Sequence, residues 1–188
     1  DSGLMKDRKM KGVIFPSLLL PVIFTLALAQ AGKPKADQER EAVCGRVPCR
    51  PAKTLKLKVS ETEVAEFDFP KGPYVADSYI NLLSGEEINV KFDDGANGPT
   101  NPRYVEKVTE TEKTVTFSLE LKDVGTILTV KNPFAKNILY DCLIQHYKDQ
   151  RLRKTTIIPV PSGLQSFEHW PYPITQVVIS NVRYGSSK

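Results

Sequence analysis

Val115-Thr116-Phe117-Ser118-Leu119-Glu120-Leu121 is the stretch of the sequence that decides the fold class. Apolar residues occupy every second position of this stretch, and polar residues stand between them. Successive side chains of a β-strand point to opposite faces of a sheet, so a period of two indicates one face in the core and one toward solvent. The stretch therefore predicts a half-buried strand.

Other segments on both sides of this strand repeat the same alternation and end in residues typical of turns. They are residues 55–59, 64–69, 88–92, 126–131, 137–147, 154–160 and 174–184. This density of short strands predicts an all-β fold, an antiparallel β-sandwich of immunoglobulin-like or related Greek-key type. Short connections suggest that 115–121, 126–131 and 137–147 form a three-stranded meander. Helix is expected only as a turn or two over residues 77–83.

The first 31 residues have the organisation of a signal peptide. Residues 6–11 hold four basic side chains against one acidic, residues 13–29 are almost entirely apolar, and residues 27–31 contain two overlapping A-x-A cleavage patterns. Translation is expected to start at Met5 or Met10, with cleavage before Gln30 or Gly32. We therefore expect a periplasmic or secreted mature protein.

An uncleaved membrane anchor is the alternative, because about twenty apolar residues span a bilayer. Pro16 and Pro21 interrupt such a helix, and the sequence after Ala31 is a mixed polar run without a basic stop signal. We therefore expect no stable membrane insertion once the signal is cleaved.

The charge balance of the mature part gives no electrostatic basis for binding nucleic acid. The chain carries +4, of which residues 1–12 contribute +2 through four basic and two acidic side chains, so the remainder carries +2. The length of the remainder suits one domain. We expect an irregular polar lead-in over residues 32–53 and a single β-sandwich over residues 54–185.

The three cysteines point to a disulfide more than to metal or thiol chemistry. Cys44 and Cys49 do not have the two-residue gap of redox pairs or most zinc sites, and an oxidising compartment favours a bond between them. Pairing of either with Cys142 is the alternative. Cys142 shares strand parity with apolar neighbours and is expected in the core. A Cys142–His146 nucleophile and base pair is disfavoured, because four strand residues span about 13 Å.

The sequence does not favour a cation-binding site. The two histidines, His146 and His169, lack the local spacing that would join them to the cysteines as zinc ligands. The stretch from Asp93 and Asp94 to Asn101 is rich in side-chain oxygens, yet it lacks the residue order of a calcium loop. We expect no metal and no cofactor, and we interpret this stretch as a connecting loop that offers a contact surface.

The segment Phe167-Glu168-His169-Trp170-Pro171-Tyr172-Pro173 concentrates aromatic side chains between prolines. Rigid aromatics with polar tips suit a ligand or partner surface, and they also serve as a plug over one end of a sandwich, which we favour. If the segment is a partner surface, its candidate contact residues are Phe167, His169, Trp170 and Tyr172. Asp93 and Asp94 are the candidate contact residues elsewhere in the chain.

Residues 163–183, in which this segment leads into the last strand, are similar to exported bacterial β-sandwich proteins that have no assigned activity. The resemblance implies an exported sandwich and brings no catalytic residue with it. The sequence also lacks a nucleophile elbow, a zinc-protease helix motif and a phosphate-binding loop. We therefore expect a non-enzymatic protein that binds a protein, envelope or glycan partner.

Two other classes of function stay open. A secreted hydrolase would bring distant carboxylates together through the fold, in a cleft that holds a pair of them. An envelope assembly or structural component would accept a strand from another chain on an unpaired sheet edge.

Overall fold

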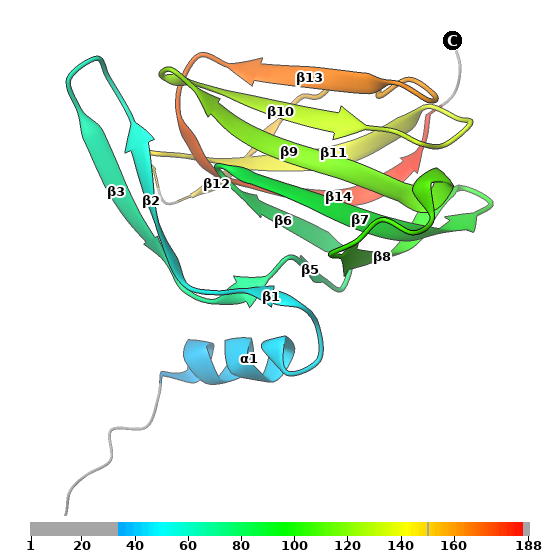
Figure 1. Ribbon diagram of the computed structural model, residues 1–188, viewed down its shortest axis with the longest axis horizontal. Helices are drawn as coiled ribbons and strands as arrows, with labels where there is room; N and C mark the ends of the chain where they lie inside the picture. The colour runs from blue at the N-terminus through cyan, green and yellow to red at the C-terminus, as the bar shows by residue number, and fades with distance from the viewer. Residues whose placement is uncertain (1–33, 150, 186–188) are drawn as a thin grey trace, which may run out of the picture. The chain divides into compact units, whose positions relative to one another are not determined.

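The computed structural model describes residues 34–149 and 151–185. The predicted signal peptide lies outside the described residues. The described residues belong to one compact unit, Lys33–Lys188. Most of them form antiparallel strands (Figure 1), which confirms the all-β prediction.

Two five-stranded sheets form the sandwich (Figure 1). The first sheet runs in the order β13 (Gln165–Trp170), β10 (Gly125–Lys131), β9 (Thr114–Lys122), β7 (Glu86–Gly95) and β8 (Gly98–Val105). The second runs in the order β12 (Leu152–Thr155), β11 (Ile138–His146), β14 (Ile174–Tyr184), β6 (Tyr79–Leu83) and β5 (Val75–Ala76).

The core lies between the two sheets. Val115, Phe117 and Leu119 of β9 are fully buried, as their alternation predicts, and they belong to one apolar cluster with Ile138 and Cys142 of β11. Burial of a side chain of this size contributes about 1.5–3 kcal/mol. The central strands therefore supply much of the stability of the sandwich.

The predicted meander is wrong in its third strand. β10 pairs with β9 and β13, whereas β11 lies in the second sheet between β12 and β14. The crossing connection is fixed by Asn132, whose buried side-chain amide donates to the backbone oxygens of Lys136 (2.9 Å), Val160 (3.1 Å) and Pro161 (3.0 Å). Val160 and Pro161 follow Asn132 by 28 and 29 residues, so the spacing of the strands along the chain does not reveal the crossing.

The expected loop from Asp93 to Asn101 is instead the paired ends of β7 and β8, joined by a turn at residues 96–97. Gly98 has φ +152°, and a Cβ there would lie 2.6 Å from the Cα of Arg183, so glycine lets β8 approach β14. Two further segments differ from expectation. Residues 79–83 form β6 rather than helix, and only the first part of 154–160 is a strand, followed by an isolated bridge from Val160 to Ile138.

The lead-in is not irregular throughout, because it contains the helix α1 (Lys35–Cys44). This helix buries none of its residues, so its sequence lacks the apolar period by which a packed helix is predicted. Lys, Gln, Glu, Arg and Ala, which fill most of it, have high intrinsic helix propensity. A short 3-10 turn, η1 (Thr111–Lys113), precedes β9.

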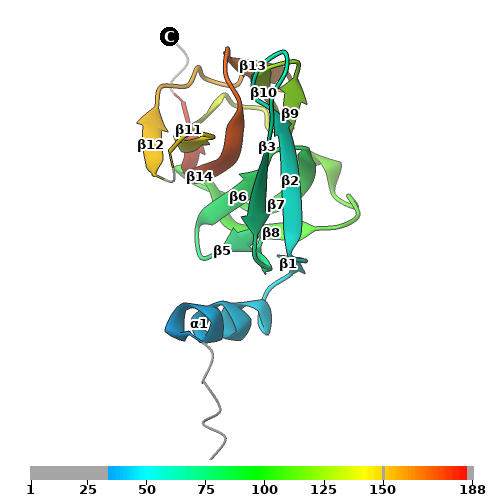
Figure 2. The same ribbon diagram turned by 90° about the vertical axis from the view of Figure 1, so that its left-hand side faces the viewer.

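A two-stranded hairpin stands apart from both sheets. It consists of β2 (Lys53–Lys58) and β3 (Val64–Phe69), and we call it the arm; Figure 2 shows it facing the viewer. At its base β1 (Cys49–Arg50) pairs with β4 (Gly72–Pro73). A cleft lies where the arm meets the ends of the sandwich strands.

Candidate binding cleft

The arm has one apolar and one polar face, both fixed by its register. Leu55 pairs with Phe67 and Leu57 with Ala65, which places apolar side chains on one face. On the other face the Lys56 ammonium lies 2.8 Å from the Glu66 carboxylate. The arm therefore behaves as a small amphipathic sheet that needs an apolar surface to cover.

That surface is one end of the sandwich. Leu55, Leu57 and Val59 of the arm are buried in a second apolar cluster with Leu83, at the end of β6. Further side chains pack around this cluster, namely Ala65, Phe67, Phe69, Leu121 and Tyr147. The arm is thus held by its own small core rather than by strand pairing with either sheet.

A buried ion pair anchors the base of the arm. Arg50 Nε lies 3.0 Å from Glu86 Oε1, off the direction of a hydrogen bond, and the guanidinium stands over the Tyr74 ring at 4.8 Å from its centroid. Burial lowers the pKa of Arg50, and the Glu86 carboxylate opposes that shift. Glu86 also accepts from the backbone N–H of Leu83 at 2.8 Å.

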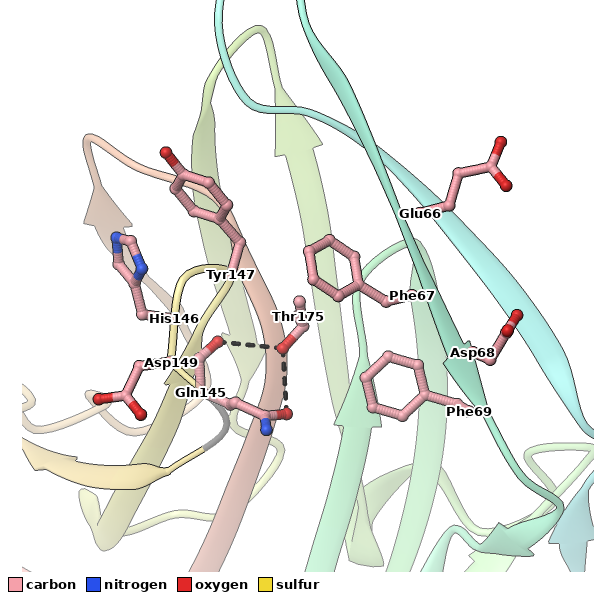
Figure 3. A pocket seen from close by; sticks show the side chains of 9 residues that line it. All are labelled: Glu66, Phe67, Asp68, Phe69, Gln145, His146, Tyr147, Asp149 and Thr175. Carbon is pink, nitrogen blue, oxygen red and sulfur yellow. Dashed lines mark hydrogen bonds between the residues drawn. The ribbon is translucent and has the colours of Figure 1, made fainter. Parts of the chain in front are cut away.

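Between β3 of the arm and the ends of β11 and β14 lies a cleft of about 190 Å³ (Figure 3). We call it the arm cleft. Figure 3 shows the Phe67 and Phe69 rings pointing from β3 toward Thr175, with Tyr147 on the opposite side. The Thr175 hydroxyl donates to the backbone and side-chain oxygens of Gln145, at 3.2 and 3.1 Å. Small-molecule pockets usually measure about 300–1,000 Å³, so this cleft suits a single side chain or ring.

The carboxylates that border the arm cleft are directed elsewhere. Glu66 and Asp68 lie on the polar face of the arm, where Asp68 accepts from the Thr54 hydroxyl at 2.6 Å. Asp149 accepts from the Arg151 N–H and the Arg153 guanidinium, both at 3.0 Å, and these two contacts lower its pKa. Among the described residues that line the cleft, no pair of carboxylates faces inward.

An aromatic group adjoins the arm cleft. The His146 ring stacks on the Tyr147 ring, with 4.6 Å between the ring centroids, and it contacts the Tyr172 ring, with 4.8 Å between the centroids. Burial lowers the pKa of His146, with a further contribution from Lys148, and His146 Nδ1 accepts from the Lys148 N–H at 3.0 Å. The lowered pKa and the accepting Nδ1 favour the neutral imidazole, which adds an aromatic ring beside the cleft.

The aromatic residues predicted as contacts do not gather at one site. Alternate residues of β13 point to opposite faces of the sheet. Trp170 is 8% exposed and belongs to the core, as the plug interpretation predicts. Phe167, 56% exposed, and His169 lie on the outer face of β13, while half-buried Tyr172 contacts His146. The structure thus brings only Tyr172 near the arm cleft.

The two aspartates predicted as contacts are occupied by neighbouring side chains. Asp93 accepts from Arg103 (3.1 Å) and Asn101 (3.0 Å), which lower its pKa to about 2, and Asp94 accepts from the Tyr184 hydroxyl (2.5 Å). Among residues 34–149 and 151–185, no group of three His, Cys, Asp or Glu side chains is placed to hold a metal.

The cysteines lie as predicted from the sequence. Cys44 and Cys49 are disulfide-bonded with their Cα atoms 5.5 Å apart, and Cys142 is a buried free thiol. Burial, followed by the nearby Glu168, raises the pKa of Cys142 to about 12. The thiol is therefore neutral and is not a nucleophile at pH 7.

The sequence does not predict the arm cleft, because its walls come from β3, β11 and β14. These strands are distant in the sequence and come together only when the arm packs against the end of the sandwich. A local signal was present: Phe67 and Phe69 alternate with Glu66 and Asp68 in a hairpin too short to bury them alone.

Comparisons with known proteins return no matching family model, no matching curated protein and no matching solved structure. Among the described residues, no helix has the length and apolarity needed to cross a membrane. The class that the structure defines is an all-β sandwich protein with an appended arm.

Proposed function

We propose that this chain is an exported, non-enzymatic protein that binds a protein partner by taking one of its apolar side chains into the arm cleft. The observation that carries the proposal is the placement of Phe67 and Phe69 opposite Tyr147 across the cleft. The signal-peptide organisation of residues 1–31 and the Cys44–Cys49 disulfide support an exported protein.

The chemistry of the cleft favours an apolar group over a glycan. A sugar presents many hydroxyl groups, each of which needs a hydrogen-bond partner when it loses water. The Thr175 hydroxyl is already donated to Gln145, and the Glu66 and Asp68 carboxylates lie on the other face of the arm. The Phe67, Phe69 and Tyr147 rings supply dispersion and apolar burial, with Gln145 and Thr175 as polar neighbours in the lining.

The same arrangement gives less support to the secreted hydrolase. Carboxylate-based hydrolysis of glycosides uses two carboxyl groups about 5–10 Å apart across the substrate. Asp149 is engaged by Arg153, and its lowered pKa keeps it ionised, which does not suit a general acid. A binding role therefore accounts better for the residues around the cleft.

The proposal is tested by NMR titration of the isotope-labelled protein with the N-acetyl amides of leucine, phenylalanine and proline, and separately with glucose and N-acetylglucosamine. One side chain in a small cleft corresponds to a Kd in the millimolar range, about −4 kcal/mol. We expect the amino-acid amides to shift the backbone resonances of Phe67, Gln145 and Thr175. The sugars should leave them unchanged.

The matched variants are Tyr147→Ala, which removes one wall of the cleft, and Tyr79→Ala, which removes a tyrosine that is 53% exposed on β6. Binding should weaken at least tenfold in the first and stay unchanged in the second. Shifts produced by the sugars alone, or equal binding by the two variants, would overturn the proposal.

A further inference from the structure

The edge strand β13 differs from the other three sheet edges. Edge strands carry unpaired backbone groups, and proteins protect them with proline, charge or short length. β8 contains Pro99 and Pro102, β12 has four residues including Arg153 and Lys154, and β5 has two residues. β13 has six residues and contains no Pro, Lys or Arg. No strand of the described residues pairs with its second edge.

Exposed apolar side chains gather along the chain segment that ends in this edge. Four of the six large apolar residues exposed in the described part of the chain fall within residues 152–167, namely Leu152, Ile158, Leu164 and Phe167. Ile158 is held to β13, because its backbone N–H donates to Glu168 Oε1 at 2.7 Å. Figure 2 shows β12 and the segment leading from it to β13. Clustered exposed apolar residues mark interaction surfaces.

We propose that β13 of this chain pairs with β13 of a second copy, antiparallel and about a two-fold axis at Phe167. A two-fold interface brings the same surface of both copies together. In this register Phe167 meets Phe167 of the partner subunit, and Gln165 meets His169 of the partner subunit. Directly opposed side chains then share a face, which keeps the inner and outer faces of the two sheets continuous.

The side chains select this register over its neighbour. An axis at Glu168 would place two carboxylates directly opposite each other, which is destabilising. The axis at Phe167 places Ser166 opposite Glu168 of the partner subunit instead. Ser166 Oγ is buried and has no hydrogen-bond partner among the described residues. That hydroxyl is enclosed within its own subunit, so what favours this register is that it leaves no two carboxylates directly opposed.

The pairing is independent of the arm cleft, because neither Phe67 nor Tyr147 lies on β13. It extends the expectation that an unpaired edge accepts a strand, and it identifies the strand as one from the same chain. Backbone hydrogen bonds along β13 would provide affinity, and Phe167 with its apolar neighbours would provide the buried area.

Sedimentation equilibrium of the exported protein tests the assembly, with Phe167→Lys compared with Tyr79→Lys. The two side chains have similar exposure, 56% and 53%, so both variants should fold equally well. We expect a dimer for the unchanged protein and for Tyr79→Lys, and a monomer for Phe167→Lys. An unchanged protein that stays monomeric at millimolar concentration, or a dimeric Phe167→Lys, would overturn the proposal.

Cysteine crosslinking tests the register. Opposed residues of antiparallel strands have Cα atoms about 4.5–5.5 Å apart, which a disulfide can bridge. Phe167→Cys should therefore crosslink to itself, whereas Gln165→Cys should not, since its own copy lies about 13 Å away along the strand. The native cysteines do not interfere, because Cys142 is buried and the other two are bonded to each other. Equal crosslinking of both variants would contradict the register.

Discussion

Arg50 and Glu86 form an ion pair that is almost completely removed from water, with side-chain exposures of 4% and 11%. Arg50 lies in β1 at the base of the arm, and Glu86 begins β7 of the sandwich. The pair therefore joins the arm to the sheet at the point where the arm departs from it. The anchor lies at the base of the hairpin whose second strand carries Phe67 and Phe69 to the arm cleft.

Glu86→Gln should lower the free energy of unfolding by about 3–5 kcal/mol, because it leaves the Arg50 charge buried without a counter-charge. Urea denaturation measures the effect. Glu87→Gln, at the exposed neighbouring position, should change stability by less than about 0.5 kcal/mol. Equal losses in the two variants would show that Arg50 does not depend on Glu86.

Trp170→Ala should cost about 3–5 kcal/mol of stability, because it empties a space in the core. His169→Ala, at the exposed position before it, should stay within about 0.5 kcal/mol. Thermal unfolding of both variants checks this contrast. A destabilising His169→Ala with a neutral Trp170→Ala would contradict the placement of these side chains on β13.

The elements that the sequence predicts well are those whose burial follows a local period. Val115, Phe117 and Leu119 alternate in the sequence and lie on one buried face of β9. The same parity predicts Cys142 in the core, and the structure confirms it as buried. Alternation of apolar and polar residues identifies the buried face of a strand wherever that face packs against the opposite sheet.

The sheet to which a strand belongs is decided by contacts between distant residues. The connection from β10 to the other sheet is fixed by hydrogen bonds from the Asn132 side chain to the backbone oxygens of Val160 and Pro161. These residues follow Asn132 by 28 and 29 positions. The arm cleft has the same origin, because β3 meets Tyr147 and Thr175 only in the folded chain. The alternation of apolar and polar residues along the sequence does not predict such contacts.

Stability should fall as the pH rises above about 9, in part through Cys142. Burial raises the pKa of this thiol from 9.0 to about 12, so above pH 9 the unfolded chain loses the proton while the folded chain keeps it. The contribution is fully present below pH 9 and is lost progressively toward pH 12, at up to about 1.4 kcal/mol per pH unit.

Urea denaturation between about pH 7 and about pH 11 should therefore show a shallower alkaline loss for Cys142→Ala than for the unchanged protein. Burial, followed by the nearby Cys142, also raises the pKa of Tyr140, so this residue adds an alkaline loss in both proteins above about pH 10. Parallel curves for the two proteins would contradict the role assigned to Cys142.

Replacing Cys44 and Cys49 by serine together should affect α1 more than the sandwich. The bond closes a short loop and contributes about 2 kcal/mol at most in the chain-entropy account, and α1 buries no residue. Hydrogen exchange should speed up over residues 35–49 and stay unchanged in β9 and β11. Faster exchange in those central strands would show that the disulfide stabilises the whole fold.

An intermolecular NOE experiment on the protein with N-acetylphenylalanine amide tests whether an apolar side chain enters the arm cleft. We expect cross-peaks from the ligand to the rings of Phe67, Phe69 and Tyr147, and none to the exposed ring of Tyr79. Cross-peaks to Tyr79 alone, or no cross-peak to any ring of the arm cleft at saturating ligand, would contradict the proposal.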